Sequence, residues 1–193
     1  METWDEIIRS IPPADAKYLR DVNASYFGAL SFSSPEEKSY LKSLGFPLPE
    51  EWLAAKSMSD QELKALADSG NVQAKTFYLD RLIDRASEYF DLRESNDAAY
   101  RTSPGAKYSL QAYELAAQIQ AANKSPFRGY LLGSAYSRLN YPASPEAGAA
   151  GMFVAYGAGD KRALNILSEY ENKHPNMEIS RILAAHNAMR SSP

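Results

Sequence analysis

Two segments of this chain share one pattern: a helix, a glycine that stops it, a polar capping residue and a second helix. Residues 62–81, ELKALADSGNVQAKTFYLDR, align with residues 151–170, GMFVAYGAGDKRALNILSEY, so that Gly70 falls on Gly159. Glycine ends helices because it adopts left-handed backbone without penalty, and the Asn or Asp that follows each glycine caps the next helix. Repeated helix pairs bury their apolar faces by stacking on their neighbours. The pattern therefore predicts antiparallel helix pairs stacked as a short α-solenoid.

Ser-Pro pairs mark further helix starts, because serine caps a helix and proline suits its first position. They place prolines at Pro35, Pro104, Pro126 and Pro145. Neither alternating β-branched residues nor Asn-Gly or Asp-Gly turns are present to predict a strand. We therefore expect an all-α fold, with an exposed loop at about 95–103. The expected helices cover about 3–10, 13–31, 35–44, 49–56, 60–69, 72–94, 104–122, 126–139, 145–158, 160–173 and 176–190.

A fainter third copy of the pattern begins at Phe127. The stretch from Leu132 to Ala163 carries a family resemblance. Its residues are Leu132-Gly133-x-x-Tyr136, then Ala149, Phe153, Ala155 and Tyr156, then Gly159-Asp160-x-x-Ala163. This pattern resembles a Sel1-like repeat, a relative of the tetratricopeptide repeat, over about residues 60–175. The resemblance implies close approach of the paired helices at Gly133 and a role in binding other proteins. We expect an N-terminal helical cap at 1–58 and repeats at 59–193.

Charge and composition exclude several classes of function. The chain carries 21 Lys and Arg against 24 Asp and Glu, a net charge of -3, without the basic stripe that nucleic-acid binding needs. Cysteine is absent, which excludes disulfides and cysteine-ligated zinc. Neither His174 nor His186 has a second ligand at a metal-binding spacing. We therefore expect neither a metal nor a cofactor.

Two features of the sequence bear on where the protein acts. Because the chain has no apolar run of about 18 residues, we expect no membrane insertion. The N-terminal residues, METWDEIIRS, lack the basic and apolar regions of an export signal. We therefore expect a cytoplasmic protein, or a periplasmic one if a signal peptide was removed beforehand.

The resemblance selects a set of residues for partner binding. In tetratricopeptide-like arrays the first helix of each pair lines a concave groove, and Tyr130 falls at a groove position that is polar in the other copies. We expect Tyr130 to be an exposed aromatic anchor flanked by the carboxylates of Asp80 and Glu169. The full set expected to line the groove is Gln73, Thr76, Asp80, Phe127, Tyr130, Ser134, Arg162, Asn165 and Glu169.

Two functions follow from these features. The first is non-enzymatic protein binding, as an adaptor or inhibitor, for a partner that offers an apolar side chain near Lys or Arg; an immunity protein for a secreted bacterial toxin is one concrete version. The alternative is a hydrolytic enzyme that uses Asp80 and Asp84, which lie one helical turn apart. A catalytic carboxylate pair should line a pocket and include a raised pKa, whereas an adaptor should show an open groove.

Overall fold

The computed structural model describes residues 3–122, 124–140 and 143–190, and it is 77% helical without strands among these residues. This confirms the all-α prediction. The described residues form thirteen helices, in the order α1 (Trp4–Ser10), α2 (Pro13–Ser25), α3 (Pro35–Ser43), α4 (Pro49–Ser57), α5 (Asp60–Asp68), α6 (Val72–Ser87), α7 (Phe90–Ser95), α8 (Asp97–Arg101), α9 (Pro104–Ala122), α10 (Pro126–Leu139), α11 (Pro145–Gly157), α12 (Ala163–Lys173) and α13 (Ile179–Arg190).

Most of the predicted start and stop signals act as expected, and Asn71 caps α6. Asp160 was expected to cap the helix after Gly159, and that prediction is wrong: the N-cap of α12 is Arg162, without a side-chain cap hydrogen bond, and Ser125 makes no such bond at the start of α10. All four Ser-Pro prolines are the first residues of helices. The Ser59 hydroxyl accepts from the backbone N–H of Glu62 at 3.2 Å, and the Glu62 carboxylate accepts from the N–H of Ser59, which completes a capping box. Gly70 and Gly159 have φ of 94° and 117°, so both stops require the left-handed conformation that glycine favours.

Three helix boundaries differ from the sequence prediction. The second helix ends at Ser25 rather than near 31, because the chain turns through left-handed backbone at Phe27 and Gly28. The predicted helix 72–94 is divided into α6 and α7. The predicted loop 95–103 contains α8, whose N-terminus is capped by the Asn96 side chain, which accepts from the N–H of Ala99 at 3.0 Å.

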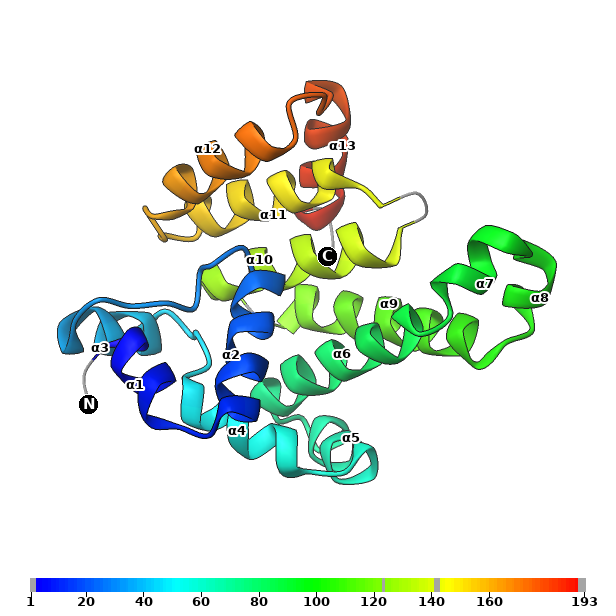
Figure 1. Cartoon of the computed structure of the whole chain (residues 1–193). Helices are drawn as coiled ribbons and strands as arrows, with labels where there is room; N and C mark the ends of the chain where they lie inside the picture. The colour runs from blue at the N-terminus through cyan, green and yellow to red at the C-terminus, as the bar shows by residue number, and fades with distance from the viewer. Residues whose placement is uncertain (1–2, 123, 141–142, 191–193) are drawn as a thin grey trace.

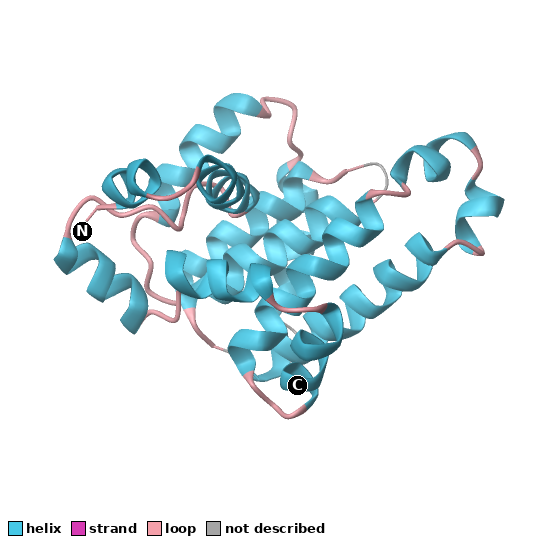
Figure 2. Cartoon of the chain, turned by 60° about the horizontal axis from the view of Figure 1, so that its bottom comes forward, coloured by secondary structure: helices cyan, strands magenta, loops and turns pink. Residues whose placement is uncertain are grey.

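From α5 onward, the helices pack side by side, in part with helices that are not their neighbours along the chain (Figures 1 and 2). The packed pairs include α5 with α6, α6 with α9, α10 with α11, and α11 with both α12 and α13. A single hydrophobic core runs from Trp4 in α1 to Met189 in α13. The N-terminal helices are therefore part of the same core as the later ones, and α2 and α4 lie across the α6 and α10 side of the stack (Figure 1).

The closest packing joins α10 to α11 through glycines. A Cβ added to Gly129 would lie 2.4 Å from the backbone N of Ala155, and one added to Gly133 would lie 3.0 Å from the Cα of Gly151. The first distance is too short for any Cβ, and the second is tighter than most Cβ contacts. Small residues on both faces therefore let the two backbones come into direct contact.

Candidate partner-binding site

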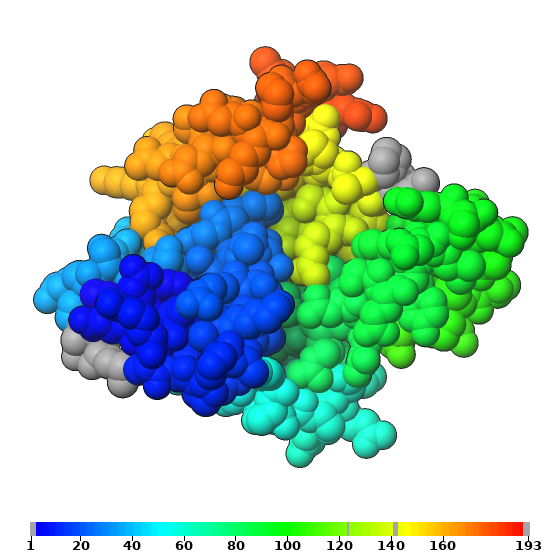
Figure 3. Space-filling model, viewed as in Figure 1, coloured from blue at the N-terminus to red at the C-terminus, as the bar shows by residue number. Residues whose placement is uncertain are grey.

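The predicted groove residues lie on α6, α10 and α12, but the structure divides them between the core and the surface. Gln73, Asn165 and Glu169 are exposed, and Arg162 is partly exposed. The remaining five residues are buried, namely Thr76, Asp80, Phe127, Tyr130 and Ser134. The groove expected from the sequence is therefore not open. Residues 3–58, which we call the N-terminal segment, fill the centre of the expected groove. Figure 3 shows this segment, in blue, in front of α10 and against α12.

Tyr130 was expected to be an exposed anchor, and that prediction is wrong. Its side chain is 0% exposed, and its ring lies 5.7 Å from the ring of Phe46. Its hydroxyl donates to Oδ2 of Asp160 at 2.9 Å, and burial holds the pKa of the Tyr130 hydroxyl well above its usual range. The comparison between copies failed here because Phe46, from outside the predicted repeats, converts an expected groove position into a core position.

Phe127 is buried for the same reason, and Ser134 is buried as well. The Phe127 ring lies 5.2 Å from the Phe46 ring and 5.3 Å from the Tyr26 ring. Tyr26 contacts Trp52 in turn, and Trp52 contacts Phe77 edge-on at 4.8 Å. A continuous column of rings therefore fills the space between α6 and α10. We call this the aromatic column; its members are Phe77, Trp52, Tyr26, Phe127, Phe46 and Tyr130.

A buried carboxylate lies beside Tyr26 in the aromatic column. The Tyr26 hydroxyl donates to Oδ1 of Asp80 at 2.7 Å, and Nη1 of Arg138 lies 3.7 Å from the same oxygen. Burial, with the nearby charge of Asp84, raises the pKa of Asp80 to about 6, although Arg138 and the Tyr26 hydrogen bond act in the opposite direction. Asp80 thus joins α6 to the N-terminal segment and to α10 rather than facing a partner.

A second buried carboxylate, Asp160, fixes Arg162 against the N-terminal segment. The Nη2 of Arg162 donates to Asp160 at 3.0 Å and to the carbonyl of Ala29 at 3.0 Å. Its Nη1 donates to the carbonyl of Ser31 at 3.2 Å and lies 3.7 Å from the Glu37 carboxylate. Arg162 therefore acts as a bridge between the start of α12 and the chain that follows α2.

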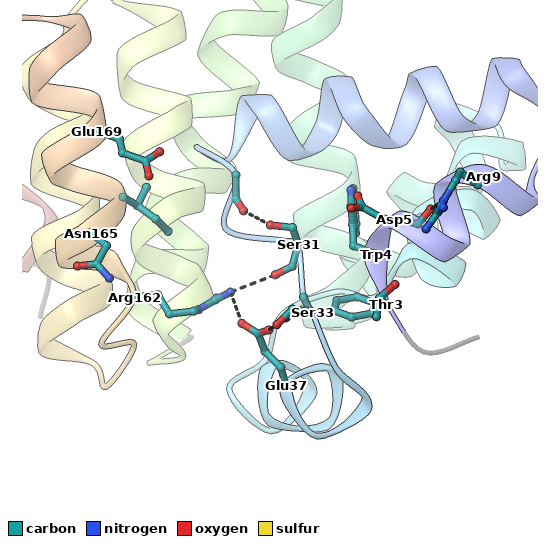
Figure 4. A pocket seen from close by; sticks show the side chains of 13 residues that line it. Thr3, Trp4, Asp5, Arg9, Ser31, Ser33, Glu37, Arg162, Asn165 and Glu169 are labelled. Atoms are coloured by element: carbon teal, nitrogen blue, oxygen red, sulfur yellow. Dashed lines mark hydrogen bonds and ion pairs between the residues drawn. The ribbon is translucent and has the colours of Figure 1, made fainter.

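The exposed residues of α12 border a cleft on the other side of this bridge. Its volume is about 560 Å³, and Figure 4 shows its lining side chains. Asn165 and Glu169 come from α12, whereas Trp4 and Asp5 come from α1 across the opening. We call this the α1–α12 cleft. The residues from α1 could not be placed here from the sequence, because no motif links residues 1–58 to the repeats.

The other predicted groove residues lie in separate depressions. Gln73 and Thr76 line one of about 340 Å³, together with Phe46 and Glu51. Asp80 lines another of about 240 Å³, which Asp84 also borders. The structure therefore brings Arg162, Asn165 and Glu169 together in the α1–α12 cleft and Gln73 and Thr76 together in a separate depression, rather than all nine residues in one groove.

The two histidines make ring contacts with aromatic side chains. The rings of His174 and Tyr170 lie 4.4 Å apart, and those of His186 and Phe153 lie 6.4 Å apart. Within the part of the chain that the structure describes, no group of three His, Cys, Asp or Glu side chains is placed to hold a metal ion. None of the helices formed by these residues has the length and apolar character required to span a bilayer.

The α1–α12 cleft is thus a surface where two helices distant in the sequence present polar and aromatic side chains together. The resemblance to Sel1-like repeats remains a prediction. Comparison with known proteins finds no match to this chain among protein-family models, curated proteins or solved structures.

Proposed function

We propose that this protein is a non-enzymatic protein-binding module built on a short α-solenoid, and that its partner docks in the α1–α12 cleft. The observation that carries the proposal is a pair of carboxylates, Asp5 and Glu169, on opposite sides of this cleft. Neither side chain has an ion-pair partner among the residues described in the structure, whereas Arg162 between them is neutralised by Asp160 and Glu37. The lining carries three carboxylates, Asp5, Glu37 and Glu169, against two cations, Arg9 and Arg162, so the cleft presents an excess of one negative charge.

The cleft also offers apolar surface beneath these carboxylates. Trp4 and Phe32 contact each other edge-on at 6.2 Å, and Ile166 of α12 is partly exposed beside them. An aromatic base with a charged rim is a common layout for a binding hot spot. A partner that inserts an apolar side chain beside a Lys or Arg would complement both features. An immunity protein that blocks a secreted bacterial toxin is one concrete form of this function.

Charge reversal within α12 tests the proposal. The partner is first captured by a photo-crosslinking residue placed at Asn165, with the same residue at Asp91 as the control. We expect Glu169→Arg to weaken binding of that partner about tenfold and to reduce its dependence on salt. Glu171→Arg, on the same helix but outside the cleft, should bind like the parent. Equal binding by both variants, or crosslinking at Asp91 alone, would place the interface elsewhere.

One observation favours the alternative, a hydrolytic enzyme. Asp80 and Asp84 border one depression, and the raised pKa of Asp80 is the property expected of a general acid. However, Asp80 is only 6% exposed, and Tyr26 and Arg138 hold its carboxylate. A hydrolytic role requires Asp84→Asn to abolish turnover in a panel of chromogenic esters, phosphoesters and glycosides. We expect the parent protein to turn over none of them.

A further inference from the structure

A second hollow lies on a different part of the molecule, where α9, α11 and α13 end and α10 begins. Its volume is about 770 Å³, which is within the size range of pockets for small organic ligands. Its lining includes three cations, Lys124, Arg128 and Arg190, and no carboxylate from the residues that the structure describes. We call it the basic pocket. It is separate from the α1–α12 cleft, with which it shares no lining residue.

The positive charge of the basic pocket is unusual in a chain whose net charge is -3. The sequence has no Asp or Glu between Glu114 and Glu146, and none in α13, so α10 and α13 carry no acidic side chain; Glu114 of α9 and Glu146 of α11 do not line the pocket. Three helix C-termini meet there, and each carries about half a negative charge, together about −1.5. Three cations exceed that amount, so an excess of positive charge remains.

Arg128 is the cation that the fold holds most firmly. Its Nη1 donates to the carbonyl of Gln120 at 2.9 Å, and the Gln120 side chain donates to the carbonyl of Ala188 at 2.9 Å. This chain of contacts ties α10, α9 and α13 together and fixes the guanidinium. Its Nε is buried without a hydrogen-bond partner among the described residues, and burial lowers the pKa of the group. A buried donor without a partner favours an acceptor supplied by a ligand.

Apolar side chains form the rest of the lining. Val154 and Met189 are 6% and 1% exposed, so they form a closed apolar floor, and Phe153 is 37% exposed at the edge. An inorganic anion would leave this surface uncovered. A ligand with an acidic group and an apolar body would pair with the cations and cover the floor at the same time.

We propose that the basic pocket binds a small organic anion with an apolar body, such as a medium-chain or aromatic carboxylate. The carboxylate accepts hydrogen bonds from Arg128, with Lys124 and Arg190 supplying charge at the opening, and the apolar body lies on Val154 and Met189. Binding here is independent of partner binding in the α1–α12 cleft. The pocket is therefore a site for a small ligand on a protein-binding module.

The test uses octanoate as the probe and the full chain as the receptor. Octanoate should bind saturably at a one-to-one ratio by titration calorimetry, and it should displace anilinonaphthalene sulfonate from the protein. Octanol matches its apolar body without the charge, and acetate matches its charge without the apolar body. We expect both to compete at least about tenfold more weakly, because a charge-assisted hydrogen bond and a buried alkyl chain each contribute on that scale.

Variants locate the site. Arg128→Gln should weaken octanoate binding about tenfold, whereas Arg101→Gln, on the exposed α8, should have no effect. Because Arg128 contacts the backbone of α9, its variant could lose stability; Lys124→Gln combined with Arg190→Gln changes only exposed side chains and should also weaken binding several-fold. The proposal is overturned if octanoate shows no saturable binding at millimolar concentration, if octanol competes equally, or if the exposed double variant binds like the parent.

Discussion

Asp80 and Asp160 each lie between a tyrosine hydroxyl and an arginine. Asp80 accepts from Tyr26 and faces Arg138, and Asp160 accepts from Tyr130 and Arg162. These buried carboxylates are structural, because each joins the N-terminal segment to a later helix directly or through its arginine. Removing one partner from such a cluster costs more than the pair contributes, since the other group is left buried without compensation.

The raised pKa of Asp80 makes a prediction about pH. In the unfolded chain this carboxyl titrates near 3.8, and in the fold near 6. Its contribution to stability is therefore fully present below about pH 4 and is lost as the pH rises through 6. Asp80→Asn stays neutral, so its free energy of unfolding relative to the parent should rise by up to about 3 kcal/mol between pH 4 and pH 7. Urea unfolding at both pH values measures this, and parallel changes in the two proteins would contradict it.

The burial of Tyr130 makes a second prediction at the residue scale. Tyr130→Ala should lower the free energy of unfolding by roughly 3–5 kcal/mol, because it leaves a cavity beside Phe46 and removes a donor to Asp160. Tyr130→Phe keeps the ring and should cost about 1–3 kcal/mol. Urea denaturation distinguishes the two variants. An unchanged urea midpoint for Tyr130→Ala would indicate that Tyr130 is exposed, as the repeat alignment implied.

At the scale of the elements, the pair α10 and α11 depends on backbone contact. A Cβ at Gly151 would lie 2.4 Å from the carbonyl O of Gly129 and 2.6 Å from the Cα of Gly133. These are backbone atoms within helices, so they cannot move away without separating α10 from α11. The contact therefore defines how closely the two helices pack.

Gly151→Ala should therefore destabilise the protein by roughly 2 kcal/mol or more, since overpacking outweighs the gain of about 1 kcal/mol in helix propensity. Gly157→Ala is the matched control in the same helix, because a Cβ there has open space. Its stability should equal or slightly exceed that of the parent. Thermal unfolding compares the variants, and equal melting temperatures for Gly151→Ala and the parent would show that the helices do not touch.

Sequence patterns predicted the elements well where local chemistry decides them. Ser-Pro pairs mark where helices start, and Gly70 and Gly159 mark where helices stop. Each signal depends on only a few neighbouring residues, so it can be recognised in a short stretch of sequence. The end of α2 was missed because Phe27 adopts a φ of 60°, a conformation that is uncommon for a bulky residue. In this conformation the Phe27 ring packs against the Tyr170 ring. The contents of the groove were missed because they depend on contacts such as Tyr26 with Asp80, 54 residues apart.

At the scale of the whole molecule, the N-terminal segment determines which surface can bind a partner. The aromatic column fills the face of α6 and α10 that the repeat pattern offered as a groove. Arg162 then joins the chain after α2 to α12, and the remaining space between α1 and α12 becomes the cleft. The proposed binding surface is thus made by two parts of the chain, neither of which forms it alone.

We expect α2 and α10 to unfold as parts of one cooperative core, with the N-terminal segment as a fixed part of it. Amide hydrogen exchange of the intact protein tests this most directly, because it measures the opening free energy of each helix without altering the chain. We predict that the slowest amides of α2 and α10 exchange with the same free energy, equal to that of global unfolding in urea. Exchange of α2 at a free energy several kcal/mol below that of α10 would contradict the account, since the N-terminal segment would then separate from α6 and α10 while these helices stay folded.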